Sequence, residues 1–444
     1  MTAGLVPAIH AANLCAMPYD ILIVGAGAAG LIAAWDLAQA GKSVAILEAR
    51  DRIGGRIFPL PESDFGYLAQ GGAEFVHGEA PISRELLKAA GATFEGAGEW
   101  WNFVDDAPRS NDWPSPHDAT LKSKLETLKH DMPVAAFFDG VLPDKKYASL
   151  REDIFRRIEG YDAADPARFS AFALREEIFS ESGWGQLNIK QGYGLLVRFL
   201  EEQGAKHRVE IVRNREVKRV ELGEGCIAIR CADGTSYQAS QGLITVPLPL
   251  LRRIEFVPAL PHKLEAAEQI GFGTVIKTLL RFESRWWEHA LGQNLERMSF
   301  AFSKQAIPTW WTQFPEPHAT LTGWVAGPRA QALSKFSEAE ILDLALTSLS
   351  DIFKFGVGVL RDKLLVARIV NWSADPFARG AYSYPTPASG AAVGQLLEPV
   401  DGKLFFAGEG VYQGEATGTV EAALATGKAA ATRMLEESRR ERRA

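Results

Sequence analysis

The segment Tyr19–Gly30 constrains the fold of this chain more than any other feature. Its apolar run Ile21–Val24 is typical of a strand buried on both faces of a parallel sheet. The run leads directly into a turn with glycine at positions 25, 27 and 30. In this spacing the first glycine permits the tight turn, the second lets the backbone approach a pyrophosphate, and the third lets the next helix pack closely on the sheet. The segment therefore predicts a strand, a turn and a helix that bind a dinucleotide.

The residues after the turn support the same interpretation. A helix is expected from Leu31, followed by a second apolar strand over Val44–Leu47 that ends on Glu48. A carboxylate at this point accepts hydrogen bonds from ribose hydroxyls and repels a 2′-phosphate, so NADP is not expected. The phosphates would meet free N–H groups in the turn around Ala28 and Ala29.

Composition excludes several classes of protein. The 444 residues carry a formal net charge of −7, which offers no basic surface to nucleic acid or to an anionic membrane. Three cysteines without CxxC spacing indicate neither a disulfide framework nor a metal site, and they fit a reducing cytoplasm. Residues 1–16 lack the features of a signal peptide or a membrane span, so they are either a true extension or a mis-start upstream of Met17. Nothing in the sequence indicates the oligomeric state.

Beyond the first unit the hydrophobic pattern changes several times. Residues 74–184 are expected to be largely helical, and residues 207–246 to form a small β-meander. A strand is expected over Val275–Phe282 and a helix over Ser337–Phe353.

Near the C-terminus another strand is followed by glycines. The apolar run 404–407 leads into Gly408 and then into a helix from about Thr419, which resembles a second strand-to-helix ligand contact. A single cofactor that bridges both chain ends requires an interleaved domain.

An arginine-rich turn follows Glu48. Arg50, Arg52 and Arg56 surround Gly55, and guanidinium groups pair bidentately with a diphosphate. Placed directly after a ribose-binding acid, this turn is typical of flavin-binding versions of the unit.

Together these motifs resemble the flavin amine oxidases, the family of monoamine oxidases, polyamine oxidases and lysine-specific histone demethylases. The resemblance runs from Tyr19 to about Leu435, and its motifs are residues 25–30, 48–56, 72–78, 246–251, 277, 371–384, 406–409 and 417–421. It implies an α/β and α+β fold, in which a Rossmann-like FAD-binding domain is interleaved with a substrate domain of mixed sheet and helices. We expect an FAD-binding domain of residues 18–78, 186–256 and 370–436, a substrate domain of residues 79–185 and 257–369, and tails of residues 1–17 and 437–444.

The resemblance also implies roles for individual residues. Lys277 matches the lysine that holds a water near flavin N5 in relatives, so a part in imine hydrolysis or in flavin reoxidation is expected. Trp372 and Tyr382 match aromatic positions beside the flavin ring and complete the expected catalytic set. Substrate contacts are expected from His77, Tyr382 and Thr419. The expected FAD contacts are Gly25, Gly27, Ala28, Ala29, Gly30, Glu48, Ala49, Arg50, Gly55, Arg56, Gly72, Ala73, Glu74, Val217, Trp372, Gly408, Glu409, Thr419 and Val420.

Three departures from the family pattern bear on how FAD is attached and on which substrates are expected. Ala381 stands where animal monoamine oxidases carry the cysteine that bonds to flavin, so noncovalent FAD is expected. Thr419 stands where those enzymes place a cage tyrosine, which leaves a half cage around Tyr382. The chain also lacks the coiled-coil insertion of histone demethylases, so a nucleosome substrate is not expected.

The expected function is oxidation of a primary or secondary amine, monoamine or polyamine-like. Hydride would pass from the α-carbon to flavin N5, the imine would hydrolyse, and O2 would reoxidise the flavin to give H2O2. Other oxidoreductases of the same plan stay open, namely an L-amino-acid oxidase or an enzyme related to desaturases and protoporphyrinogen oxidases. A non-catalytic flavin-binding scaffold is a third alternative.

Overall fold

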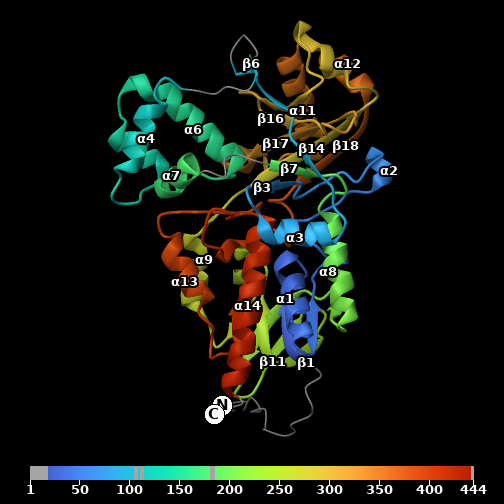
Figure 1. Ribbon diagram of the computed structural model, residues 1–444, viewed down its shortest axis with the longest axis vertical. Coiled ribbons are helices and arrows are strands. Elements are labelled where there is room, and N and C mark those ends of the chain that lie inside the picture. The colour runs from blue at the N-terminus through green and yellow to red at the C-terminus, as the bar shows by residue number, and fades with distance from the viewer. Residues whose placement is uncertain (1–18, 105–108, 111–114, 181–185, 442–444) are drawn as a thin grey trace, which may run out of the picture.

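A computed structural model describes residues 19–104, 109–110, 115–180 and 186–441. Two bodies built on separate sheets lie one above the other (Figure 1). The lower body contains both the first described strand and the last helix, so widely separated parts of the chain share it. The predicted combination of an α/β unit with a second region of sheet and helices is confirmed.

The lower sheet takes its strands from the beginning, the middle and the end of the chain. Its order is β12 (Glu255–Val257), β9 (Val217–Leu222), β10 (Ile227–Cys231), β11 (Ser236–Ile244), β1 (Tyr19–Val24), β2 (Val44–Leu47) and β8 (Glu210–Val212), with β20 (Leu404–Phe406) also paired to β11. Strands β1, β2, β8, β11 and β20 run parallel, whereas β9, β10 and β11 form an antiparallel meander. The predicted meander is therefore confirmed over β9–β11, whereas β8, also within the predicted range, pairs in parallel with β2.

Helices cover both faces of this sheet. On one face α1 (Ala28–Gln39) lies between α8 (Gly194–Lys206) and α14 (Val420–Glu441), with α3 (Pro81–Ala89) across their upper ends (Figure 1). On the other, α9 (Pro261–Gln269) packs on α13 (Ser389–Leu397), close to the 3-10 turn Leu248–Arg253. Apolar residues of β1 alternate between the two cores: Ile21 and Ile23 face the α1 side, whereas Leu22 and Val24 face the other.

Helix α1 begins at Ala28, three residues before the predicted start at Leu31. The prediction was wrong at this boundary because the glycine turn is tighter than expected: Gly27 already adopts the extended conformation of an N-cap residue. A Cβ on Gly30 would overlap the carbonyl oxygen of Gly25, and a Cβ on Gly427 would overlap that of Ala29. Glycine at these two positions therefore permits α1 to lie close to the turn and to α14.

The upper sheet carries the predicted strand Val275–Phe282 as β14. Its order is β18 (Leu364–Asn371), β14, β17 (Thr320–Ala326), β16 (Thr309–Trp311), β15 (Met298–Phe302), β5 (Glu99–Asn102) and β6 (Arg109–Ser110). It packs against α10 (Gly327–Leu333), α11 (Glu338–Phe353), α12 (Val357–Lys363) and the 3-10 segment Trp286–Gly292. Ser337 and Glu340 form a capping box that fixes the start of α11, in agreement with the predicted helix.

A group of helices lies beside the upper sheet (Figure 1). It comprises α4 (Asp118–Glu126), α5 (Val134–Val141), the 3-10 turn Lys145–Tyr147, α6 (Ala148–Tyr161) and α7 (Ala171–Phe179). Small elements join the two bodies: β3 (Phe75–His77), β4 (Phe94–Gly96) and β7 (Gln186–Ile189) form one sheet, and β13 (Gly271–Phe272) pairs with β19 (Ser383–Tyr384). Helix α2 (Glu62–Phe65) lies beside the upper sheet, where Asp64 forms an ion pair with Arg368 of β18.

The expectation of a largely helical segment over residues 74–184 was partly wrong. Strands β3, β4, β5 and β6 lie within it; β6 pairs with β5, whereas the partners of β3, β4 and β5, namely β7 and β15, come from later in the chain. A local hydrophobic pattern does not reveal such pairings because the stabilising partner is distant in sequence.

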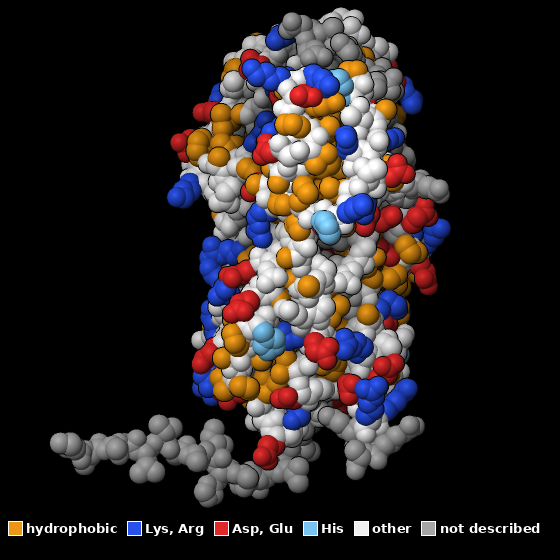
Figure 2. Space-filling model, turned by 90° about the vertical axis from the view of Figure 1, so that its left-hand side faces the viewer, with side chains coloured by type: hydrophobic (Ala, Val, Ile, Leu, Met, Phe, Trp, Pro, Cys, Tyr) orange, Lys and Arg blue, Asp and Glu red, His pale blue; other side chains and the backbone are white. Residues whose placement is uncertain are grey.

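The ends of the expected domains can be compared only in part. Helix α14 continues to Glu441, so residues 437–441 are helical rather than the start of a tail. The domain boundaries otherwise stay a prediction, and residues 1–16 lie outside the described residues. Among the described helices, none is long and apolar enough to span a membrane. On the face shown in Figure 2, acidic and basic side chains are interspersed.

We expect Gly30→Ala to lower the melting temperature of the FAD-free protein by several degrees, because its Cβ would overlap Gly25 O. Gly27→Ala is the matched control, since a Cβ at that position meets no atom within 4 Å. Thermal unfolding followed by circular dichroism measures both variants. Equal melting temperatures for Gly30→Ala and Gly27→Ala would contradict the close-packing role of Gly30.

Candidate active site

One cavity of about 1370 Å³ extends from the carboxyl ends of β1 and β2 to the upper sheet. Ligands bind at the carboxyl ends of strands in open α/β sheets, so its position is the expected one for this fold. The volume exceeds the few hundred to about 1,000 Å³ of a pocket for one small ligand. The cavity can therefore hold a dinucleotide and a second molecule.

The glycine turn forms one end of the cavity. Gly25, Gly27, Ala28 and Ala29 line it, whereas Gly30 does not and instead packs against Gly25. No side chain caps the N-terminus of α1, so the first N–H groups of this helix stay available to a phosphate. Four of the five predicted FAD contacts in the turn therefore lie on the cavity wall, and the fifth, Gly30, supports the turn from behind.

Glu48 lies beside the turn with its carboxylate buried. It accepts hydrogen bonds from the backbone N–H groups of Ala26 at 2.8 Å and of Arg50 at 2.9 Å. Each carboxylate oxygen has two lone pairs, so acceptor capacity remains for ribose hydroxyls. Ala49 lines the same part of the cavity, as does Val217, the first residue of β9.

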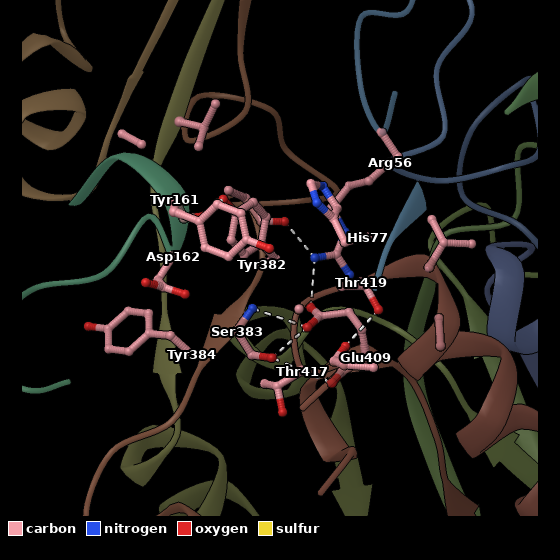
Figure 3. Close-up of a pocket in the computed structure, with 18 of the residues that line it drawn as sticks. Arg56, His77, Tyr161, Asp162, Tyr382, Ser383, Tyr384, Glu409, Thr417 and Thr419 are labelled. Carbon is pink, nitrogen blue, oxygen red and sulfur yellow. Dashed lines mark hydrogen bonds and ion pairs between the residues drawn. The ribbon is translucent and has the colours of Figure 1, made fainter. Parts of the chain in front are cut away.

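The two arginines expected at the diphosphate have protein partners. Arg50 forms a bidentate ion pair with Asp375, at 2.5 and 3.0 Å. Arg56 pairs with Glu409 at 2.7 Å and donates to the carbonyl of Ala381 at 2.6 Å (Figure 3). Both arginines still line the cavity, as does Gly55, and their contact with a diphosphate stays a prediction. Asp375 could not be recognised as a partner of Arg50 from the sequence.

Lys277 lies within β14, and 1 % of its side chain is exposed. Its Nζ lies 2.6 Å from Oε2 of Glu74 and donates to the carbonyl of Gly72 at 3.1 Å. Burial lowers the pKa of Lys277, and the charge of Glu74 opposes that shift. Gly72, Ala73 and Glu74 all line the cavity. Lys277 is therefore bonded through its hydrogen bond and ion pair to a segment that is expected to contact FAD.

Two predicted aromatic residues meet the cavity from the loop after β18 (Leu364–Asn371). Trp372 is buried and donates from Nε1 to the carbonyl of Gly71 at 3.1 Å. The hydroxyl of Tyr382 donates to the carbonyl of Tyr161 at 2.6 Å, and burial raises the pKa of Tyr382 well above its usual value. Both rings are thus held in place by hydrogen bonds, as a wall beside a planar ligand requires.

The remaining predicted residues lie at the start of α14 and on β3. Gly408, Glu409, Thr419 and Val420 line the cavity, and the hydroxyl of Thr419 accepts a hydrogen bond from Ala422 N at 3.2 Å. His77 also lines it, and burial lowers the pKa of His77 to about 4, so this imidazole is neutral at pH 7. The imidazole of His77 packs edge-on against the ring of Tyr161, with ring centroids 5.6 Å apart.

Further wall residues had no assignment from the sequence. Trp311 and Trp324 line the cavity, whereas Trp287 and Trp310 are buried in the core of the upper body. Additional aromatic and ionisable lining residues are Trp100, Phe300, Phe302, Arg157, Tyr161, Asp162 and Glu177. Spacing could not separate Trp310 from Trp311, because neighbouring residues of a strand face opposite sides and the sequence does not show which side meets the cavity.

The residues present fit FAD. The wall contains an uncapped helix N-terminus, a turn in which Gly27 has open space where a Cβ would lie, and a buried carboxylate with unused acceptor capacity. The N-terminus of a second helix, α14, lies in the same cavity beyond Arg56 and Glu409. Together these features are the ones that a bound FAD requires of the cavity wall.

Comparison with known proteins identifies the family. Residues 28–111 and 113–435 match the family model described as "Flavin containing amine oxidoreductase". The chain belongs to this family, so the predicted family and the cofactor FAD are confirmed, and the protein is an enzyme that acts on amines. The expected absence of a covalent bond to flavin stays a prediction, with Ala381 on the cavity wall.

The chain is similar to several characterised proteins. "Polyamine oxidase 4" of Oryza sativa subsp. japonica is 28 % identical, and the alignment covers 97 % of this chain and 91 % of that protein. "Lysine-specific histone demethylase 2" of Homo sapiens is 25 % identical over 88 % of this chain, which corresponds to 50 % of that protein. The structure of cyclohexylamine oxidase from Brevibacterium oxydans superimposes with a TM-score of 0.78 at 21 % identity, over 95 % of this chain and 100 % of that one. The last similarity shows the shared fold.

Glu177 generates a prediction for the pH dependence of stability. Burial raises its pKa from 4.5 to about 7, so the folded protein favours the protonated carboxyl group. The contribution of Glu177 to stability is therefore fully present below about pH 4.5 and is lost as the pH rises through about 7. We expect the melting temperature of Glu177→Gln to rise relative to wild type across this interval.

Glu202→Gln is the matched control, because Glu202 is an exposed glutamate on α8 of the lower body and is not among the groups that act on Glu177. Its melting curve should run parallel to that of wild type at every pH. A constant difference between Glu177→Gln and wild type from about pH 5 to 8 would contradict the raised pKa.

Proposed function

We propose that this chain is a FAD-dependent oxidase of a primary or secondary amine, monoamine or polyamine-like, that uses O2 as its electron acceptor. The overall reaction converts an amine R2CH–NHR′, O2 and water into a carbonyl compound, the amine R′NH2 and H2O2. The buried ammonium group of Lys277 on the wall of the continuous cavity is the observation that carries this proposal.

FAD, when bound, accepts hydride at N5 from the α-carbon and passes the electrons to O2. The protein supplies Lys277, whose ammonium group has three N–H donors. Contacts with Gly72 and Glu74 account for two of them, and the third can hold the water that attacks the imine carbon. The positive charge also favours the reduction of O2, because negative charge develops on oxygen.

Trp372 and Tyr382 would orient the amine. Their fixed rings offer an apolar wall to a neutral amine, and an electron-rich face to a cationic one. Holding the α-carbon in one position accounts for much of the protein's part in such a reaction.

The carboxyl groups on the substrate side favour amines over the alternative substrates. Asp162 and Glu177 line the cavity there and offer hydrogen-bonding groups to the nitrogen of an amine, which an apolar polyene could not use. Arg157, which could clamp the carboxylate of an amino acid, already has Glu177 as a partner at 3.5 Å. These contacts support amine oxidation above a desaturase or an L-amino-acid oxidase.

We expect the bound FAD of the purified protein to lose its visible absorbance when the protein is mixed anaerobically with an amine. Monoamines, polyamines, amino acids and polyenes form the panel, and admission of O2 should restore the absorbance with formation of H2O2. Reduction by an amino acid or a polyene alone would favour the corresponding alternative. If no compound of the panel reduces the flavin, the proposal is wrong.

Lys277→Met should retain FAD but slow reoxidation, or overall amine oxidation, by about tenfold or more, because the ammonium group is lost. Lys263→Met is the matched control. Lys263 is equally buried, but it contacts main-chain carbonyls at the end of α13, away from the cavity that holds Lys277. Stopped-flow absorbance measures both half-reactions. If both half-reactions of Lys277→Met run at the wild-type rate, Lys277 has only a structural role.

A further inference from the structure

Glu74 has three side-chain partners from the upper sheet. Its Oε2 lies 2.6 Å from Nζ of Lys277, whereas its Oε1 accepts hydrogen bonds from Trp311 Nε1 and Gln313 Nε2, each at 3.2 Å. The side chain of Glu74 is 11 % exposed. A cavity-lining segment of the lower body is thereby connected to β14 and to the end of β16.

The geometry around Lys277 explains why this carboxylate is needed. An ammonium group buried in an apolar strand tends to lose its proton unless an opposite charge lies close to it. Glu74 supplies that charge, and the ring of Trp311 lies 5.1 Å from Nζ, where it adds a cation–π contact. The same tryptophan therefore contacts the lysine with its ring face and the glutamate with its N–H group.

We propose that Glu74 is a positioning residue that acts through Lys277: it keeps the ammonium group protonated and fixes it at the cavity wall. Trp311 and Gln313 in turn fix the carboxylate. The inference rests on the proposed function, because it assigns a role within the site where the amine is oxidised.

The charged surroundings of this pair are simple among the described residues. Glu74 is the titratable group that acts on Lys277, and it opposes the effect of burial on the lysine pKa. Tyr67 faces Glu74 from the loop after α2 (Glu62–Phe65), and burial together with the charge of Glu74 raises the pKa of Tyr67. Tyr67 is therefore uncharged wherever the pair operates, and Glu74 is the titratable group that opposes the effect of burial on Lys277.

A double-mutant cycle tests the inference. The variants are Glu74→Gln, Lys277→Met and the double variant. Asp36→Asn is the control, because it also replaces a carboxylate in an ion pair, with Lys428 on the outer helices α1 and α14. The holoproteins are reduced with dithionite and mixed with O2, so that reoxidation is measured without an amine. Reduction by the best amine of the panel is measured separately, across about pH 6 to 10.

We expect Glu74→Gln to slow the step that Lys277→Met slows, by about tenfold, with a larger effect at high pH because the lysine loses its proton earlier. Added to Lys277→Met, the Glu74→Gln change should slow that step no further. The absorbance of oxidised bound FAD should acquire a pH titration in Glu74→Gln that is absent in the double variant. Asp36→Asn should match wild type.

Three results would overturn the inference. They are additive effects of the two substitutions, rates of Glu74→Gln equal to wild type at every pH, and an unchanged reoxidation and reduction in Lys277→Met. Failure of the proposed function has a different signature, since wild-type FAD would then resist every amine while dithionite reduction and reoxidation still complete the cycle.

Discussion

The close approach of α1 (Ala28–Gln39) to the glycine turn and to α14 (Val420–Glu441) determines where the site can form. Main-chain atoms meet at Gly30 and Gly427 without an intervening side chain. Because both helices are anchored in this way, both of their N-termini lie at the same cavity. Two positive helix ends then face a ligand whose phosphates and reduced ring carry negative charge.

The ion pairs of the cavity join parts of the chain that local sequence does not connect. Arg56 reaches Glu409 across 353 positions, and Lys277 reaches Glu74 across 203. Each pair connects a residue of the early FAD-contact motifs to one that arrives much later. The cavity is therefore complete only when the two bodies have assembled, which is consistent with one cofactor being shared by both chain ends.

The sequence predicted those parts of the site whose residues conflict with their surroundings or have a fixed local geometry. The glycine turn and Glu48 follow from the geometry of one βαβ unit, and Lys277 stands out as a charge within an apolar strand. The resemblance to a known family supplied Trp372 and Tyr382, which composition alone would assign to the core.

The partners of these residues could not be predicted. Asp375 looks like an ordinary surface acid in the sequence, and Glu74 was expected to contact FAD; only the fold brings them to Arg50 and Lys277. Asp162 and Glu177 lie at the ends of amphipathic helices, where a carboxylate is normally solvated. The start of α1 was misplaced for a related reason, because the extent of a turn depends on contacts beyond it.

The substrate side of the cavity has walls of two kinds from separate stretches of the chain. The carboxyl groups of Asp162 and Glu177 come from the helical stretch that includes α6 and α7, whereas Trp311 and Trp324 come from strands of the upper sheet. Substitutions in the helical stretch can change the preferred charge of a substrate while the strands keep the preferred shape. Selection can therefore adjust these two properties one at a time, without disturbing the residues that hold the cofactor.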